Sequence, residues 1–152
     1  MNTELLPFSG ESARKAAEIM RAGGIVGIPT ETVYGLAADA RNESAVRSIF
    51  QAKGRPQDNP LIVHISCIEQ LPPLVREIPD LALKIAEKYW PGPLTMIFPK
   101  SDLIPSATSG GLDTVAVRMP QSPAARAIID ACGFPLAAPS ANLSGSPSPT
   151  TA

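Results

Sequence analysis

Short apolar segments alternate along this chain with segments in which alanine, isoleucine and leucine recur at helical spacing. The expected strands are 25–28, 61–65, 94–98, 114–118 and 136–138. The expected helices are 11–22, 43–53, 79–89 and 123–132. Strands that alternate with helices predict an α/β sandwich, and the 152 residues fit one domain without an internal repeat.

Residues at the expected boundaries support these helices. Asn42 can cap the second helix, and Pro79 suits the first turn of the third. In the third helix, Leu83, Ile85 and Ala86 are expected to face the core.

Composition excludes some classes of protein. A hydrophobic content of 44% with 18% charged residues is ordinary for a globular domain, and no stretch approaches the ~20 apolar residues that span a bilayer. The first residues lack the basic and apolar regions of a secretory signal, so we expect a cytoplasmic protein. The net charge of −1 is unlike that of a nucleic-acid binder dominated by phosphate contacts, although it leaves room for a local basic patch.

The two cysteines are isolated in the sequence. Cys67 and Cys132 each have apolar neighbours, which predicts buried, reduced thiols. His64 is the only imidazole that could join them, so we expect no metal site made by the protein.

The segment 53–61, KGRPQDNPL, places Lys53 and Arg55 on either side of a glycine. A loop there can present both cations to one anion, because a guanidinium binds phosphate as a planar fork and an ammonium as a point charge. A solvated basic turn is the alternative. The chain has neither a P-loop nor a Rossmann fingerprint, so ATP, if bound, must be held by side chains and irregular loops. Ser140 and Asn142, after the last apolar strand, suit that task.

Two polar residues stand on otherwise apolar strands. Strand alternation separates Arg118 from Val115 and Val117, and a buried guanidinium requires a partner. That partner is either a structural carboxylate of the chain or the carboxylate of a ligand. His64 shares a strand face with Ile62 and is either a core histidine or a ligand contact.

Four segments carry a resemblance to a known family: PTETVYGL at 29–36, KGRPQDNPL at 53–61, VAVRMP at 115–120 and PSAN at 139–142. In this order they are similar to the YrdC-like family of threonylcarbamoyl-AMP synthases, over about residue 23 to the last residue. The resemblance implies a twisted mixed sheet flanked by helices. It also implies a nucleotidyltransferase that joins L-threonine, bicarbonate and ATP into threonylcarbamoyl-adenylate and pyrophosphate. A partner complex would then transfer the threonylcarbamoyl group to tRNA, and an RNA contact of the chain itself is possible.

The resemblance also implies roles for individual residues. The catalytic residues would be Lys53 and Arg55, which offset the charge of the pyrophosphate together with Mg²⁺. The ATP site would comprise Lys53, Arg55, Asn59, Thr114, Ser140, Asn142 and Ser148. The threonine site would comprise Thr32, Tyr34, His64, Arg118 and Ala138, with Arg118 on the threonine carboxylate. Glu31 and Asp58 either orient the metal or the cations, or are solvated.

The same resemblance implies that residues 1–152 form a catalytic domain incomplete at its C-terminus, since the family continues with a further helix and strand. From these residues alone we expect weak or absent synthase activity. The Ser/Pro-rich segment 143–152 is expected to be a flexible loop.

Two other functions stay open. One is a carbamoyl-adenylate domain of a hydrogenase-maturation carbamoyltransferase, although the zinc-finger and acylphosphatase-like segments of those proteins are absent from this sequence. The other is an RNA-binding module without catalysis.

Overall fold

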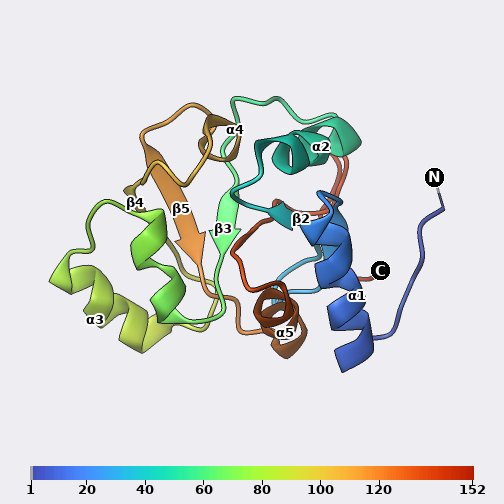
Figure 1. The fold of residues 1–152 in the computed structure, drawn as a ribbon, viewed down its shortest axis with the longest axis horizontal. Coiled ribbons are helices and arrows are strands. Elements are labelled where there is room, and N and C mark those ends of the chain that lie inside the picture. Colours follow the sequence, from blue (N-terminus) through green and yellow to red (C-terminus); the bar gives the residue numbers. More distant parts are fainter. Residues whose placement is uncertain (1) are drawn as a thin grey trace.

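A six-stranded mixed sheet with the strand order β1-β2-β6-β3-β5-β4 organises the computed structural model, which describes residues 2–152 (Figure 1). Its strands are β1 (Val26–Ile28), β2 (Gly35–Asp39), β3 (Ile62–His64), β4 (Thr95–Pro99), β5 (Thr114–Arg118) and β6 (Leu136–Ala137). Strands β3 and β5 are parallel, and the other neighbours are antiparallel. The expected α/β fold, with a mixed sheet and flanking helices, is confirmed. Five strands lie where the sequence predicts them, whereas β2 was not predicted.

The helices are α1 (Gly10–Arg21), α2 (Glu43–Lys53), α3 (Asp80–Tyr89), α4 (Ser106–Ser109) and α5 (Pro123–Cys132). Two 3₁₀ turns, η1 (Ile68–Gln70) and η2 (Pro72–Leu74), precede α3. The four predicted helices are confirmed, and the Asn42 side chain caps α2 by accepting a hydrogen bond from the Ala45 amide at 3.1 Å. None of the helices in residues 2–152 is long and apolar enough to cross a membrane.

The sheet separates two hydrophobic cores. Neighbouring residues of β2, Ala37 and Ala38, belong to different cores, as strand alternation requires. One core lies under α1 and α5, which stand beside each other in Figure 1. The other lies under α2, α4 and the C-terminal end of α3. Leu83 of α3 does not face this core as predicted, because it is 39% exposed and Ala82 and Ala86 pack there instead.

The face of the sheet that carries α1 and α5 is open over β3, β5 and β4. Ile62, Ala116 and Ile97 are partners in register across these strands, so they share this face. Ile97 is 70% exposed, and Ile62 and Ala116 are half-buried. His64 and Arg118 are also register partners and lie on the same face, one pair further along. This face of the sheet therefore carries two buried polar side chains next to its exposed part.

The two cysteines differ in exposure. Cys132 is a buried free thiol in α5, and burial raises its pKa to about 11. Cys67 is a free thiol but is exposed, so the expectation of a buried residue is wrong there. It directly precedes η1, where the chain runs over the surface and its apolar neighbours face inward without it.

Candidate functional site

A tight turn between β1 and β2 forms one wall of the site. The Thr30 hydroxyl oxygen accepts hydrogen bonds from the backbone amides of Thr32 and Val33, both at 3.2 Å, and donates to the Val33 carbonyl at 2.6 Å. This arrangement fixes Thr32, whose hydroxyl oxygen lies 3.1 Å from that of Thr30. Thr30 was missed as a site residue, although threonine after a strand-ending proline is a typical turn signal.

Gly35 follows this turn and allows a close approach of two segments. A Cβ at Gly35 would lie 3.3 Å from the Ala138 Cβ and 3.4 Å from the Pro139 carbonyl oxygen, which is tighter than ordinary contact. The absence of a side chain lets β2 and the segment after β6 meet at the edge of the site.

A cavity of about 250 Å³ opens between this turn, β3, the end of β5 and the segment after β6. All five residues expected around threonine line it: Thr32, Tyr34, His64, Arg118 and Ala138. Ser140 of the expected ATP site lines it as well. The sequence analysis assigned no role to the other lining residues, which are Thr30, Val33, Gly35, Ile62 and Pro139.

Arg118 ends β5 with its guanidinium buried beside the cavity. Its Nε donates to the Gly92 carbonyl at 3.3 Å, and its Nη1 donates to the Thr32 hydroxyl at 3.4 Å. Its Nη2 forms an ion pair with the Glu31 carboxylate. Burial lowers the pKa of Arg118. The partner that a buried guanidinium requires is therefore Glu31, while a ligand carboxylate on Arg118 stays a prediction.

His64 lies on the floor of the cavity and is fully buried. Its Nδ1 is 3.1 Å from the Ile62 carbonyl oxygen, so the ring donates a hydrogen bond there when Nδ1 carries the proton. Burial lowers the pKa of His64 to about 4. At neutral pH the imidazole is uncharged, so it can donate or accept a hydrogen bond but adds no charge.

Lys53 is the last residue of α2 and is only 3% exposed. Its ammonium donates to the backbone carbonyl oxygens of Ser140 and Asn142. Burial lowers the pKa of Lys53, and the charge of Arg55 lowers it further. A loop was expected to present both cations, and for Lys53 this is wrong. Lys53 belongs to the predicted helix, which ends at Gly54, where φ is 59° and therefore left-handed.

The loop after α2 carries the other candidate phosphate ligands. Arg55 is half-buried, and its Nη2 lies 3.4 Å from the Pro60 carbonyl oxygen. Its Nε is buried without a hydrogen-bond partner among residues 2–152. Asn59 is exposed in the same loop, and Thr114 is half-buried at the start of β5. No side-chain hydrogen bond within residues 2–152 joins either of them to Lys53 or Arg55.

The side chains of Asn142 and Ser148 form a hydrogen bond with each other, and Asn142 also forms hydrogen bonds with the backbone of its own loop. The Asn142 side-chain amide donates to the carbonyls of Leu143 and Ser146, both at 2.9 Å, and its Oδ1 accepts from the Ser148 hydroxyl at 3.3 Å. The Tyr34 amide, directly before β2, donates to the Pro149 carbonyl at 2.9 Å, which links the segment to the turn beside the cavity. Residues 143–152 form no helix or strand, and their flexibility stays a prediction.

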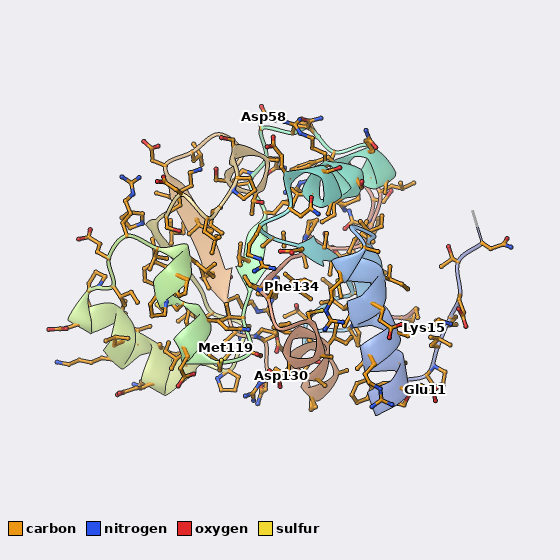
Figure 2. The ribbon with its side chains drawn as sticks, in the orientation of Figure 1. Glu11, Lys15, Asp58, Met119, Asp130 and Phe134 are labelled. Carbon is orange, nitrogen blue, oxygen red and sulfur yellow. The ribbon has the colours of Figure 1, made fainter. Side chains whose placement is uncertain are left out.

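The acidic residues that were considered for a metal lie apart. Glu31 is engaged by Arg118, whereas Asp58 is exposed and points outward at the edge of the molecule (Figure 2). Within residues 2–152 no group of three His, Cys, Asp or Glu side chains could hold a metal ion. Mg²⁺ usually binds through one or two carboxylates together with substrate phosphates, so the residues present fit an ion that arrives on ATP better than a caged one.

Known proteins resemble this chain in sequence and in structure. The family model Sua5_yciO_yrdC, described as Telomere recombination, matches residues 18–152. A threonylcarbamoyl-AMP synthase of Pyrococcus abyssi is 57% identical over 91% of the chain and 41% of its own length. A threonylcarbamoyl-AMP synthase of Bacillus subtilis is 50% identical over 99% of the chain and 44% of its own length.

The fold comparison agrees with the sequence comparison. The crystal structure of P. abyssi Sua5 complexed with L-threonine matches with a TM-score of 0.94 and 54% identity, over 97% of this chain and 43% of that one. The chain therefore spans less than half the length of these relatives.

Proposed function

Because the chain belongs to the Sua5/YciO/YrdC family, we propose that it carries the activity for which its relatives are named, the synthesis of threonylcarbamoyl-AMP. The substrates would be L-threonine, bicarbonate and ATP, and the products threonylcarbamoyl-adenylate and pyrophosphate. A tRNA-modifying complex in the cytoplasm would use the adenylate. The complex, the location and any RNA contact are parts of this proposal.

One observation carries the proposal. The cavity brings together the five residues expected around threonine, from the turn before β2, from β3, from β5 and from the segment after β6. It combines a buried guanidinium with hydroxyl groups and a neutral imidazole. These groups suit an α-amino acid with a side-chain hydroxyl, because its carboxylate needs a cation while its hydroxyl needs neutral hydrogen-bond partners.

The residues of this chain would act mainly by positioning. Arg118 and Thr32 would hold the threonine carboxylate in the cavity, which leaves the amine free to form a carbamate with bicarbonate, with loss of water. A carbamate oxygen then attacks the α-phosphorus of ATP, and the bond from that phosphorus to the pyrophosphate oxygen breaks. Holding the reactants in line and neutralising the leaving group supplies most of the catalysis in such a transfer.

The nucleotide would lie between the C-terminal end of α2 and the segment 140–148. Arg55 is suited to the phosphates, because its partly buried guanidinium has an Nε without a partner among the described residues. Lys53 adds positive charge beside it. Mg²⁺, when bound to the phosphates, would withdraw further charge from the leaving pyrophosphate.

The two alternatives predict different products. A carbamoyl-adenylate domain would release pyrophosphate with carbamoyl phosphate and ATP but would not need threonine. An RNA-binding module would release none. The cavity supports the first proposal, because its polar lining includes all five residues expected around threonine.

The decisive experiment incubates the purified chain with ATP, bicarbonate and L-threonine and looks for the adenylate by mass spectrometry. Formation that depends on both threonine and bicarbonate supports the proposal. Pyrophosphate release that requires carbamoyl phosphate supports the carbamoyl-adenylate domain. Binding of RNA, without binding of threonine or ATP, contradicts any synthase.

A further inference from the structure

Glu31 joins two parts of the site that are far apart in the sequence. One carboxylate oxygen forms the ion pair with Nη2 of Arg118. The other oxygen accepts hydrogen bonds from the backbone amides of Gln121 and, at 3.2 Å, of Ser122. Ser122 is the N-cap of α5, so the carboxylate lies at the positive end of that helix. Both side chains of the ion pair are largely buried, with 10% of Arg118 and 19% of Glu31 exposed.

Nη1 is the nitrogen of the Arg118 guanidinium best placed to bind a ligand, because its one contact is with Thr32, which lines the cavity. Nε donates to the Gly92 carbonyl, whereas Nη2 forms an ion pair with Glu31 but no well-oriented hydrogen bond. Nη1 has two protons, and its single contact is the long one of 3.4 Å to the Thr32 hydroxyl. A bidentate contact through Nη1 and Nη2 would place the ligand carboxylate next to that of Glu31, and the two negative charges would repel each other.

We propose that Glu31 is a positioning residue, which fixes Arg118 so that Nη1 and the Thr32 hydroxyl together hold one oxygen of the substrate carboxylate. The inference rests on the proposed function, since it assigns how the substrate of that site is held. Glu31 itself does not touch the substrate. It acts through Arg118.

The opposite role would be that of a competitor that the substrate displaces from Arg118. The hydrogen bonds from the backbone amides to Glu31 oppose its displacement. If Glu31 left, the amides of Gln121 and Ser122 would lose their acceptor, and the Glu31 charge would need another partner. A carboxylate held at a helix N-terminus by two amides is more costly to move than one held by a single flexible side chain.

The variant Glu31→Gln tests the proposal, because glutamine keeps an oxygen for the amides of Gln121 and Ser122 but removes the charge that Arg118 faces. The matched control is Asp39→Asn, which removes the charge of another carboxylate paired with an arginine, Arg41 at 3.0 Å, away from the cavity. Binding of L-threonine and of ATP is measured for both variants and the wild type by calorimetry, and KM and kcat where turnover is seen.

We expect Glu31→Gln to weaken threonine binding at least tenfold and to raise KM for threonine, with ATP affinity within twofold of the wild type. Asp39→Asn should leave threonine affinity unchanged. Tighter threonine binding by Glu31→Gln would show a competitor and overturn the proposal. Unchanged threonine affinity with a lower Tm would show a purely structural ion pair and would also overturn it.

A second readout does not depend on threonine. In arginine-selectively ¹⁵N-labelled protein, a guanidinium held by Glu31 and Gly92 should rotate slowly and give separate Nη signals, which Arg118→Lys identifies by their loss. Glu31→Gln should merge these signals and Asp39→Asn should not. If the signals behave as expected but the wild type binds no threonine, the proposed function fails while the fixing of Arg118 stands. If they are merged in the wild type, the inference itself fails.

Discussion

The ammonium of Lys53 donates a hydrogen bond to the backbone carbonyl of Ser140, a residue 87 positions further along the chain. A second bond to the Asn142 carbonyl and one from the Ser144 amide to the Lys53 carbonyl complete the link. The end of α2 and the segment after β6 therefore form one unit. Lys53 is placed to shape the loop that carries Ser140 and Asn142, in addition to any contact that it makes with phosphate.

Replacing Lys53 with methionine should lower the stability of the folded protein. The variant leaves two carbonyl groups without their donor, and each such group costs roughly 1–3 kcal/mol when buried. We expect the free energy of unfolding to fall by about 2 kcal/mol or more, as measured by urea denaturation. Lys84→Met is the control, because Lys84 is exposed on α3. Stability equal to that of the wild type would contradict the structural role of Lys53.

Replacing Arg55 with alanine should separate nucleotide binding from folding. Arg55 makes one long contact with the protein and is half-buried, so its loss should change stability little. A charge-assisted contact with phosphate is worth roughly 1.5–3 kcal/mol, or about tenfold to a hundredfold in ATP affinity. Calorimetry with ATP measures this, with Arg76→Ala as a control at an exposed arginine outside the site. ATP affinity that both variants leave unchanged would remove Arg55 from the nucleotide site.

The sequence predicted the elements whose signals are local. Asn42 caps the helix that it was expected to start, because capping depends on only a few neighbouring residues. Strand β2 was missed because Gly35–Asp39 is rich in glycine and alanine, which have little strand preference, and only its neighbours β1 and β6 make it a strand. Leu83 was misplaced because helical spacing does not tell how much of a helix face the rest of the chain covers.

The candidate site was predicted mainly from the resemblance, and the structure adds what holds it together. Strand alternation required a partner for Arg118 but could not identify it. The partner, Glu31, lies 87 positions earlier, and its own position depends on amides at the start of α5. Lys53 was expected at the end of a helix but with its ammonium presented by a loop, whereas its burial depends on contacts with residues 140–144. Pairings across such separations follow from the topology and not from local pattern.

Replacing Arg118 with lysine should impair threonine binding more than ATP binding. A single ammonium cannot at once contact the Gly92 carbonyl, pair with Glu31 and reach the cavity, as the guanidinium does. We expect threonine affinity to fall about tenfold to a hundredfold, with ATP affinity nearly unchanged. Arg126→Lys on α5 is the control for a lost arginine contact outside the cavity. If Arg118→Lys lowers only the Tm and spares threonine affinity, Arg118 is a structural ion-pair residue.

His64 should make the protein sensitive to mild acid. Burial lowers its pKa from 6.5 to about 4, so the unfolded chain takes up a proton at a higher pH than the folded protein does. The unfolded state binds more protons between these values, and stability therefore decreases as the pH falls from about 6.5 to about 4. Above pH 6.5 the imidazole is neutral in both states and its titration has no effect. A shift of this size corresponds to a loss of about 3 kcal/mol at the low end.

The variant His64→Gln separates this effect from the general acid response of the carboxylates. Glutamine can still donate a hydrogen bond toward the Ile62 carbonyl but does not titrate. We expect urea denaturation of the wild type to show the loss of about 3 kcal/mol between pH 6.5 and 4, and the variant to lack it, so that the two curves converge toward low pH. Parallel curves would mean that His64 becomes protonated inside the folded protein near pH 6.5. In that case the cavity would have to provide a partner for an imidazolium, and the role of His64 as a neutral contact for threonine would be wrong.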